Sequence, residues 1–261
     1  MAKKFVCDIF SEKEANVIVF SCKTTESIRE VSQLVEPFDI EKQKNLLENV
    51  KIFDAGEIAI EEVSKKTKEI IEKNKLLLIL AERHVVSLYT VKALPKDTKI
   101  IVFDAHADLK DQYLGEKTNY ATWLRRVSEL VNPKNICLIG VRSCDEDEFN
   151  FMKENDILYF TANQVKTNLQ EIKEKLKGFV KDSKVYISID MDVFDPSVAP
   201  AVENPEPNGI LYREFLELVG EVCKEKVVGM DLVEIRPLPK NRITEFLAIK
   251  IIFEVISQIK I

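Results

Sequence analysis

The sequence predicts an α/β fold in which helices cover both faces of a parallel sheet. Short apolar runs alternate with longer amphipathic ones along the whole chain. This order is typical of parallel sheets, because each parallel connection needs a crossover that a helix usually supplies. The 261 residues are 46% hydrophobic and 31% charged, enough for a large core, and no linker, repeat or low-complexity tract divides them. We therefore expect one α/β domain over residues 1–261.

The predicted strands are four to six residues long and mainly apolar, as strands buried on both faces should be. In chain order they are Asn16–Ser21, a weaker run at Val50–Phe53, Leu76–Ala81, Lys99–Phe103, Asn135–Gly140, Ile157–Phe160, Lys184–Ile189 and Val227–Leu232.

The segments between these strands repeat apolar residues with helical spacing. The predicted helices are Ile58–Lys73, Thr118–Leu130, Gln164–Val180, Arg213–Lys224 and Arg242–Gln258. A further helix is expected soon after the first strand, directly behind Lys23-Thr24-Thr25-Glu26.

Charge and composition exclude several classes of partner. The net charge is -6, and Lys and Glu are interspersed without a basic stripe, so we expect neither nucleic acid nor a membrane surface as a partner. No apolar run is long enough for a membrane span, and Met1–Phe5 does not begin a signal peptide. The five cysteines form no Cys-x-x-Cys pair, which fits a reducing compartment. We expect a cytoplasmic protein.

Two strand ends carry metal-ligand residue types at alternating positions. One is Asp104-Ala105-His106-Ala107-Asp108, and the other contains Asp190 and Asp192. In extended chain, residues two apart point to one side, so each set converges on one face. Four carboxylates and an imidazole aimed at one place repel each other unless cations lie between them. The pattern predicts a site for two divalent metals; the alternative is a turn in which Asp104 caps a helix.

His84 adds a further candidate ligand. The chain has two histidines, and His84 follows the predicted strand Leu76–Ala81 as His106 follows Lys99–Phe103. Open α/β sheets place ligand sites at the carboxyl ends of their strands. A lone histidine there is otherwise a polar cap, but the neighbouring acidic motifs favour a ligand. Carboxylates and imidazoles without a thiolate suit an ion such as Mn²⁺.

These motifs resemble those of the ureohydrolase family, which includes arginases, agmatinases and formimidoylglutamases. The family's Asp-Ala-His-x-Asp stands at Asp104–Asp108, and its long Ser-x-Asp-x-Asp-x-x-Asp-Pro-x-x-x-Pro motif stands at Ser188–Pro200. Two later signatures follow in order and spacing, at Gly209–Glu214 and Asp231–Pro237. The resemblance covers roughly Leu76 to the C-terminus.

The resemblance implies a fold, a cofactor and an assembly. The fold is a three-layer α/β/α sandwich with a mainly parallel eight-stranded sheet, and the assembly is a homo-oligomer, a trimer or hexamer. The cofactor is a pair of Mn²⁺ ions, with other divalent metals possible. The implied ligands are His84, Asp104, His106, Asp108, Asp190 and Asp192. Asp104 and Asp190 would bridge the two ions.

The resemblance also implies hydrolysis of a linear guanidino or amidine C–N bond, with agmatine, cleaved to putrescine and urea, as the default substrate. Two ions roughly 3.5–4 Å apart can activate a water for attack on the guanidinium carbon. Asp108 would pass the water's proton to the leaving amine, and Glu234 would pair with the guanidinium. Tyr120 is the third catalytic candidate, because it stands where the family has a histidine that contacts substrate or shuttles protons.

Several positions depart from the family pattern. Where the family has Gly-Gly-Asp-His-Ser, this chain has Ala81–Val85 with Arg83 before the histidine, and Gly-Thr-Gly-Thr-Pro has become Ala201–Pro205 with Asn204 inside it. The Gly/Pro-rich loop after the first strand is missing. These changes keep two alternatives open: a related hydrolase with another guanidino, formimino or amide substrate, and a metal-binding member without turnover.

Overall fold

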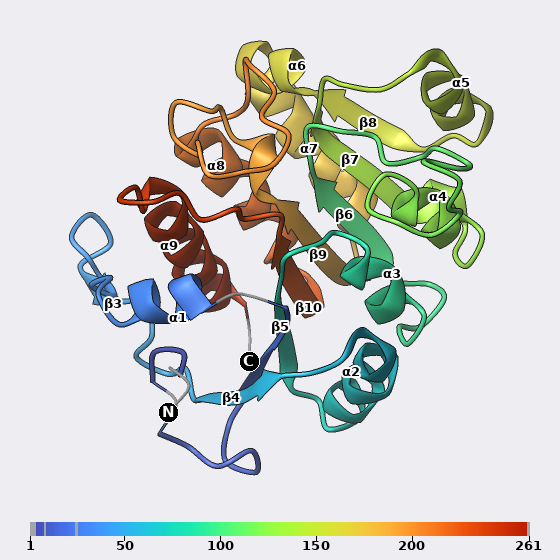
Figure 1. The fold of residues 1–261 in the computed structure, drawn as a ribbon. Coiled ribbons are helices and arrows are strands. Elements are labelled where there is room, and N and C mark those ends of the chain that lie inside the picture. The colour runs from blue at the N-terminus through green and yellow to red at the C-terminus, as the bar shows by residue number, and fades with distance from the viewer. Residues whose placement is uncertain (1–3, 8, 24–25, 260–261) are drawn as a thin grey trace.

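The computed structural model describes residues 4–7, 9–23 and 26–259, which form an eight-stranded parallel sheet between two layers of helices (Figure 1). The strand order is β4-β1-β5-β10-β9-β6-β7-β8. The strands are β1 (Val17–Cys22), β4 (Ile52–Glu57), β5 (Leu76–Ala81), β6 (Lys99–Phe103), β7 (Ile136–Val141), β8 (Leu158–Thr161), β9 (Lys184–Asp190) and β10 (Lys226–Val233). The predicted α/β/α fold is confirmed. A small antiparallel pair, β2 (Phe38–Asp39) and β3 (Lys44–Asn45), lies outside the main sheet.

The side chains of alternate residues in each strand point to opposite faces of the sheet and pack into the core on that face. In β5, Leu76, Leu78 and Leu80 belong to one apolar cluster, and Leu77 and Ile79 belong to another on the opposite face. Helices α1, α7, α8 and α9 pack on the first face, and α2, α3 and α4 cover the second (Figure 1). Burial on both faces explains why these strands lack the alternation of a half-exposed strand.

The helices depart more from the prediction than the strands do. The α-helices are α1 (Glu26–Ser32), α2 (Val63–Glu72), α3 (Val86–Val91), α4 (Trp123–Ser128), α5 (Glu146–Glu154), α6 (Ala162–Thr167), α7 (Leu169–Val180), α8 (Tyr212–Val222) and α9 (Ile243–Gln258). Helices α3 and α5 were not predicted, and the helix predicted over 164–180 is broken into α6 and α7 at Asn168.

The prediction of a helix over 118–130 was wrong in its first part, since α4 begins at Trp123. The side chain of Asn119 explains the difference. Its Oδ1 accepts a hydrogen bond from the Ala121 amide at 3.0 Å, and the Asn119 amide donates to Thr122 Oγ1 at 2.9 Å. Such local bonds offer the backbone an alternative to helix, so 119–122 forms a turn.

A buried ion pair ties the edge strand β4 to α1. Arg29 on α1 and Asp54 on β4 are 6% and 0% exposed, and the guanidinium donates two hydrogen bonds to the carboxylate at 2.7 and 2.9 Å. Arg29 also donates to Ser21 on β1 at 2.9 Å. Burial opposes ionisation of Asp54, but Arg29 outweighs it, so the pKa of Asp54 lies below its ordinary value.

The carboxyl ends of β5, β10, β9 and β6 lie next to one another in the sheet. The later strands β9 and β10 insert between β5 and β6, which brings distant parts of the chain to one edge. His84 follows β5, Asp104 follows β6, Asp190 ends β9, and Glu234 follows β10. The topology therefore collects the predicted site residues.

Candidate metal centre and substrate pocket

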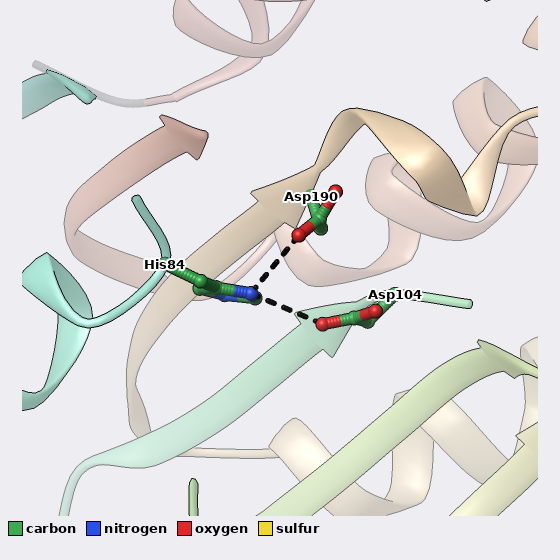
Figure 2. A group of neighbouring side chains, drawn as sticks. All are labelled: His84, Asp104 and Asp190. Atoms are coloured by element: carbon green, nitrogen blue, oxygen red, sulfur yellow. Dashed lines mark ion pairs between the residues drawn. The ribbon is translucent and has the colours of Figure 1, made fainter. Parts of the chain in front are cut away.

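Two groups of metal-ligand side chains lie at this edge and share Asp104. In the first, His84 Nδ1 lies 3.1 Å from Asp104 Oδ2 and 3.2 Å from Asp190 Oδ2 (Figure 2). In the second, His106 Nδ1 lies 2.9 Å from Asp192 Oδ2 and 3.7 Å from Asp104 Oδ1.

Asp108, the sixth predicted ligand, lies on the His84 side of the cluster. Its Oδ2 is 3.6 Å from His84 Nδ1. The structure thus brings all six predicted ligands together. Asp190, which the resemblance implies as a second bridge, groups with His84 and Asp104 and is not part of the His106 group.

Backbone amides hold the carboxylates in position. Asp104 Oδ1 accepts from the His106 amide at 2.7 Å, and Asp190 Oδ1 accepts from the Asp192 amide at 2.9 Å. Asp192 Oδ1 accepts from the Ala105 amide at 3.1 Å, which links the two motifs. In all three carboxylates the amides bind Oδ1 and leave Oδ2 directed at a histidine. The Oδ2 atoms of Asp104 and Asp190 face His84, and that of Asp192 faces His106.

The donor set fits a cation. His84 Nδ1 and Asp104 Oδ2 are buried without a hydrogen-bond partner among the described residues, which is costly unless something else satisfies them. The tautomer of His84 inferred from its hydrogen bonds also fits a cation at Nδ1. Ser188 Oγ donates to Asp231 Oδ1 at 2.7 Å, so His84 Nε2, 2.8 Å from that hydroxyl, must be the donor to it. In the neutral ring, which cation binding requires, Nδ1 then carries a lone pair that points at the carboxylates.

The electrostatics of the cluster favour protons when cations are not bound. Burial, with neighbouring carboxylates, raises the pKa of Asp190 and of Asp108 well above the ordinary range. Burial opposes protonation of His106, but Asp104 and Asp192 outweigh it and raise the pKa of His106 to about 12. Divalent ions would replace these protons, so metal affinity should rise with pH.

Two of the predicted catalytic residues have left-handed backbone conformations. Asp108 has φ of 53° and Glu234 has φ of 60°. This region is uncommon for residues other than glycine and is often found at functional sites. Asp108 Oδ2 also accepts from the indole Nε1 of Trp123 at 2.8 Å, and the Trp123 ring lies 4.2 Å from that of His84.

A cavity of about 480 Å³ opens beside the cluster. Its lining includes Asp108, Tyr120, Asn204 and Glu234 in addition to ligand residues. Glu234 is 6% exposed, and its Oε1 accepts from the His84 amide at 2.8 Å. Burial raises the pKa of Glu234 to about 7 and, with a smaller effect of Tyr113, raises the pKa of Tyr120.

Three departures from the family pattern meet at the edge of this cavity. Arg83 pairs with Glu203 at 2.6 Å, lies over the Tyr120 ring at 5.0 Å from its centroid, and comes within 3.9 Å of Glu234. Glu203 also accepts from Arg236 at 2.6 Å. Changes that are scattered in the sequence therefore form one contact network.

Sequence reasoning did not identify three residues that contact the site. Trp123 positions Asp108, Glu206 lies 3.8 Å from His106 Nε2, and Arg142 binds the carbonyls around them. Trp123 is the only tryptophan of the chain. That rarity was a usable signal for Trp123, whereas no local pattern distinguishes Glu206 or Arg142 from other charged residues.

Comparison with known proteins agrees with the geometry. The model of the Arginase family matches residues 23–257. An agmatinase of Halalkalibacterium halodurans is 34% identical over 224 residues, 80% of this chain and 75% of that protein. An N(1)-aminopropylagmatine ureohydrolase of Synechocystis is 29% identical over 208 residues, 78% and 67% of the two chains. The crystal structure of agmatine ureohydrolase of Thermoplasma volcanium superposes with a TM-score of 0.90 at 28% identity, covering 99% of this chain and 94% of that one. The chain therefore belongs to the arginase family, and its relatives include agmatinases.

Proposed function

We propose that this protein is a binuclear manganese-dependent hydrolase that converts agmatine and water into putrescine and urea. The observation that carries the proposal is the pair of ligand groups sharing Asp104, with the unpartnered His84 Nδ1 between carboxylates and the Glu234 carboxylate in the same cavity. The agmatinases among its relatives support agmatine as the substrate. The product amine would assign the protein to polyamine biosynthesis.

The ligands proposed for two Mn²⁺ ions are His84, Asp104, His106, Asp108, Asp190 and Asp192. Oxygen and imidazole donors suit Mn²⁺, and other divalent metals would also bind them. Bound there, the ions would supply an activated water and neutralise charge that develops on the substrate.

Protein side chains would bind the substrate and transfer the proton in the proposed reaction. Glu234 would pair with the guanidinium and orient its carbon toward the cluster, because a planar cation matches a carboxylate in a two-point contact. Asp108 would take the proton of the attacking water and deliver it to the amine nitrogen as the C–N bond breaks. Trp123 holds Asp108 in place for this transfer. Tyr120 would face the substrate as a neutral phenol, since its pKa is raised by burial.

A second candidate substrate is a longer guanidino amine such as N(1)-aminopropylagmatine, which the name of one relative specifies for that protein. The same site would cleave the same bond. Agmatine and N(1)-aminopropylagmatine differ in the length of the amine chain that would extend from the ligand cluster.

We also propose a cytoplasmic homo-oligomer, a trimer or hexamer. Large apolar side chains are exposed near the ends of α1 and α9, including Leu34 at 58% and Ile243 at 53%. Such side chains support an interface between subunits. In the described part of the chain, no helix combines the length and apolar character that a bilayer crossing requires. Light scattering of the purified protein measures the assembly.

The test is a substrate panel on protein reconstituted with Mn²⁺. Urea or amine release is measured with agmatine, N(1)-aminopropylagmatine, arginine, guanidinobutyrate, guanidinopropionate and formimidoylglutamate. We expect the highest kcat/KM with agmatine. Preference for formimidoylglutamate would replace the proposal with the related hydrolase. No release from any substrate, with two ions bound, would reject turnover.

A further inference from the structure

The lining of the cavity is strongly acidic. Eight of its nineteen residues are Asp or Glu, and Lys110 is the one lysine or arginine among them. A surface with this excess attracts cations and repels anions. A substrate cation can pair only with a carboxylate that no protein group already neutralises.

Seven of the eight have a partner or a proposed role. Asp108, Asp190 and Asp192 belong to the ligand cluster, and Glu234 is assigned to the guanidinium.

The other three of these seven carboxylates are neutralised by protein cations. Glu203 pairs with Arg83 and Arg236 at 2.6 Å each. Asp145 and Glu148 share Lys110, which lies 2.9 Å from Glu148 and in direct contact with Asp145. Lys110 is itself occupied by this pairing and is not available to a substrate carboxylate.

Glu206 is the remaining carboxylate. No Lys or Arg of the described residues lies within 4.0 Å of the Glu206 carboxylate, and His106 Nε2 lies 3.8 Å from its Oε1. Its side chain is 34% exposed, so the carboxylate reaches solvent through the cavity.

The backbone that carries Glu206 is held in place. Arg142 donates to the Glu206 carbonyl at 2.9 Å and to the Pro207 carbonyl at 3.0 Å. The same guanidinium donates to the Asp192 carbonyl at 2.8 Å, which fixes the loop against the end of β9. Pro205 and Pro207 flank Glu206 and restrict its backbone further. Glu206 is therefore presented at a set position beside His106.

We propose that Glu206 determines specificity by binding a second positive charge of the substrate, the ammonium group at the end opposite the guanidinium. The inference rests on the proposed function and adds a substrate class to it: linear guanidino amines with a cation at each end. Glu234 lies beside His84 and Glu206 beside His106, so the cavity offers one carboxylate next to each ligand group. Substrates with a distal carboxylate would meet Glu206, and among the described residues that line the cavity the one lysine, Lys110, is already paired with Asp145 and Glu148.

The experiment compares Glu206→Gln with Asp145→Asn, a matched loss of charge at a lining carboxylate that Lys110 already neutralises. Asparagine at 145 also keeps the helix cap of α5. Three substrates that share the guanidinium and differ at the distal end are measured: agmatine with an ammonium, butylguanidine with an uncharged methyl and guanidinobutyrate with a carboxylate. In Glu206→Gln, kcat/KM for agmatine should fall about tenfold, mainly through KM, as a partly exposed charge-assisted bond is lost. Butylguanidine should change less than about twofold, because it lacks the charge that Glu206 binds. Asp145→Asn should leave all three unchanged.

Metal content and ligand binding complete the test. If Glu206 instead stabilises His106 as a ligand, Glu206→Gln should lose metal affinity by about 10–100-fold and lose activity equally on all substrates, which would overturn the proposal. Calorimetry with 1,4-diaminobutane and 1-aminobutane gives a readout without turnover. The diamine should bind wild type more tightly than the monoamine, and Glu206→Gln should remove the difference. An equal preference in both proteins would reject the inference even if agmatine is hydrolysed. A diamine preference without turnover would keep it and reject the proposed function.

Discussion

Replacing Glu234 with Gln tests the guanidinium contact directly. Glutamine keeps the size of the side chain and an oxygen that can accept from the His84 amide, as Glu234 Oε1 does at 2.8 Å. The change therefore removes the charge and leaves the local backbone, with its φ of 60°, in place. The proposed metal ligands are untouched, so metal content should not change.

The magnitude follows from burial. The Glu234 side chain is 8% exposed, so a guanidinium paired with it is largely removed from water. Loss of one member of such a pair costs about 2–5 kcal/mol, or roughly 30-fold to a few thousandfold in kcat/KM. Arg83, 3.9 Å from Glu234, already lies near this carboxylate and is itself paired with Glu203. Because Arg83 weakens the field that the substrate meets, we expect an effect in the lower half of that range.

The assay is kcat/KM for agmatine with Mn²⁺-loaded protein, with Asp145→Asn as the control. A pH series adds a second readout. Burial raises the pKa of Glu234 to about 7, and the carboxylate binds a cation only when ionised. Wild-type kcat/KM should therefore fall as the pH drops through this pKa, which bound metal ions would move lower. Glu234→Gln should lack this acidic limb. Nearly full kcat/KM in Glu234→Gln would refute the guanidinium role and favour a neutral amide substrate.

Three further predictions concern metal, proton transfer and stability. Metal analysis after reconstitution should give about two Mn²⁺ per chain, and Asp190→Ala should retain fewer; saturation at one ion in wild type would reject the binuclear site. Tyr120→His should raise turnover on agmatine at neutral pH by about tenfold or more, because an imidazole titrates there and the phenol does not. The control variant Tyr120→Phe should match wild type. An unchanged rate in Tyr120→His would exclude Tyr120 from the proton path. Asp54→Asn should lower the free energy of unfolding in urea at pH 7 by about 3–5 kcal/mol, because it removes the carboxylate charge that pairs with the buried Arg29 guanidinium. The pKa of Asp54 is depressed in the folded state, so its contribution is present above the unfolded pKa and is lost as pH falls through the folded value; a difference from wild type that stays constant down to pH 2 would contradict this account.

Sequence patterns predicted the sheet well because its strands are buried on both faces. The bounds of β5 and β6 match the predicted runs, and the weaker run at 50–53 lies at the start of edge strand β4. Helix limits were less predictable, because side-chain contacts of single residues decide them. Asn119 delays the start of one predicted helix to Trp123, and α3 is six residues long, too short for a periodic pattern to be recognised.

The cluster of candidate metal ligands was predictable because its residues occupy alternating positions at strand ends, where residues two apart in sequence share one face. The residues that surround this cluster were not predictable from the sequence. Trp123, Glu206 and Arg142 reach the cluster through contacts between segments that are far apart in sequence. Neither spacing nor periodicity records such contacts.

The network around Arg83 changes the meaning of the departures from the family pattern. Taken alone, an arginine before His84 places a cation near the carboxylate that should bind a guanidinium, which suggests lost function. In the structure Glu203, which stands in the replaced 201–205 segment, pairs with Arg83 at 2.6 Å, and the Tyr120 ring lies against the guanidinium. A cation that is paired and stacked repels a second cation less than a free one does. The three changes therefore compensate one another, and together they are better explained by a reshaped substrate pocket than by the decay of an unused one.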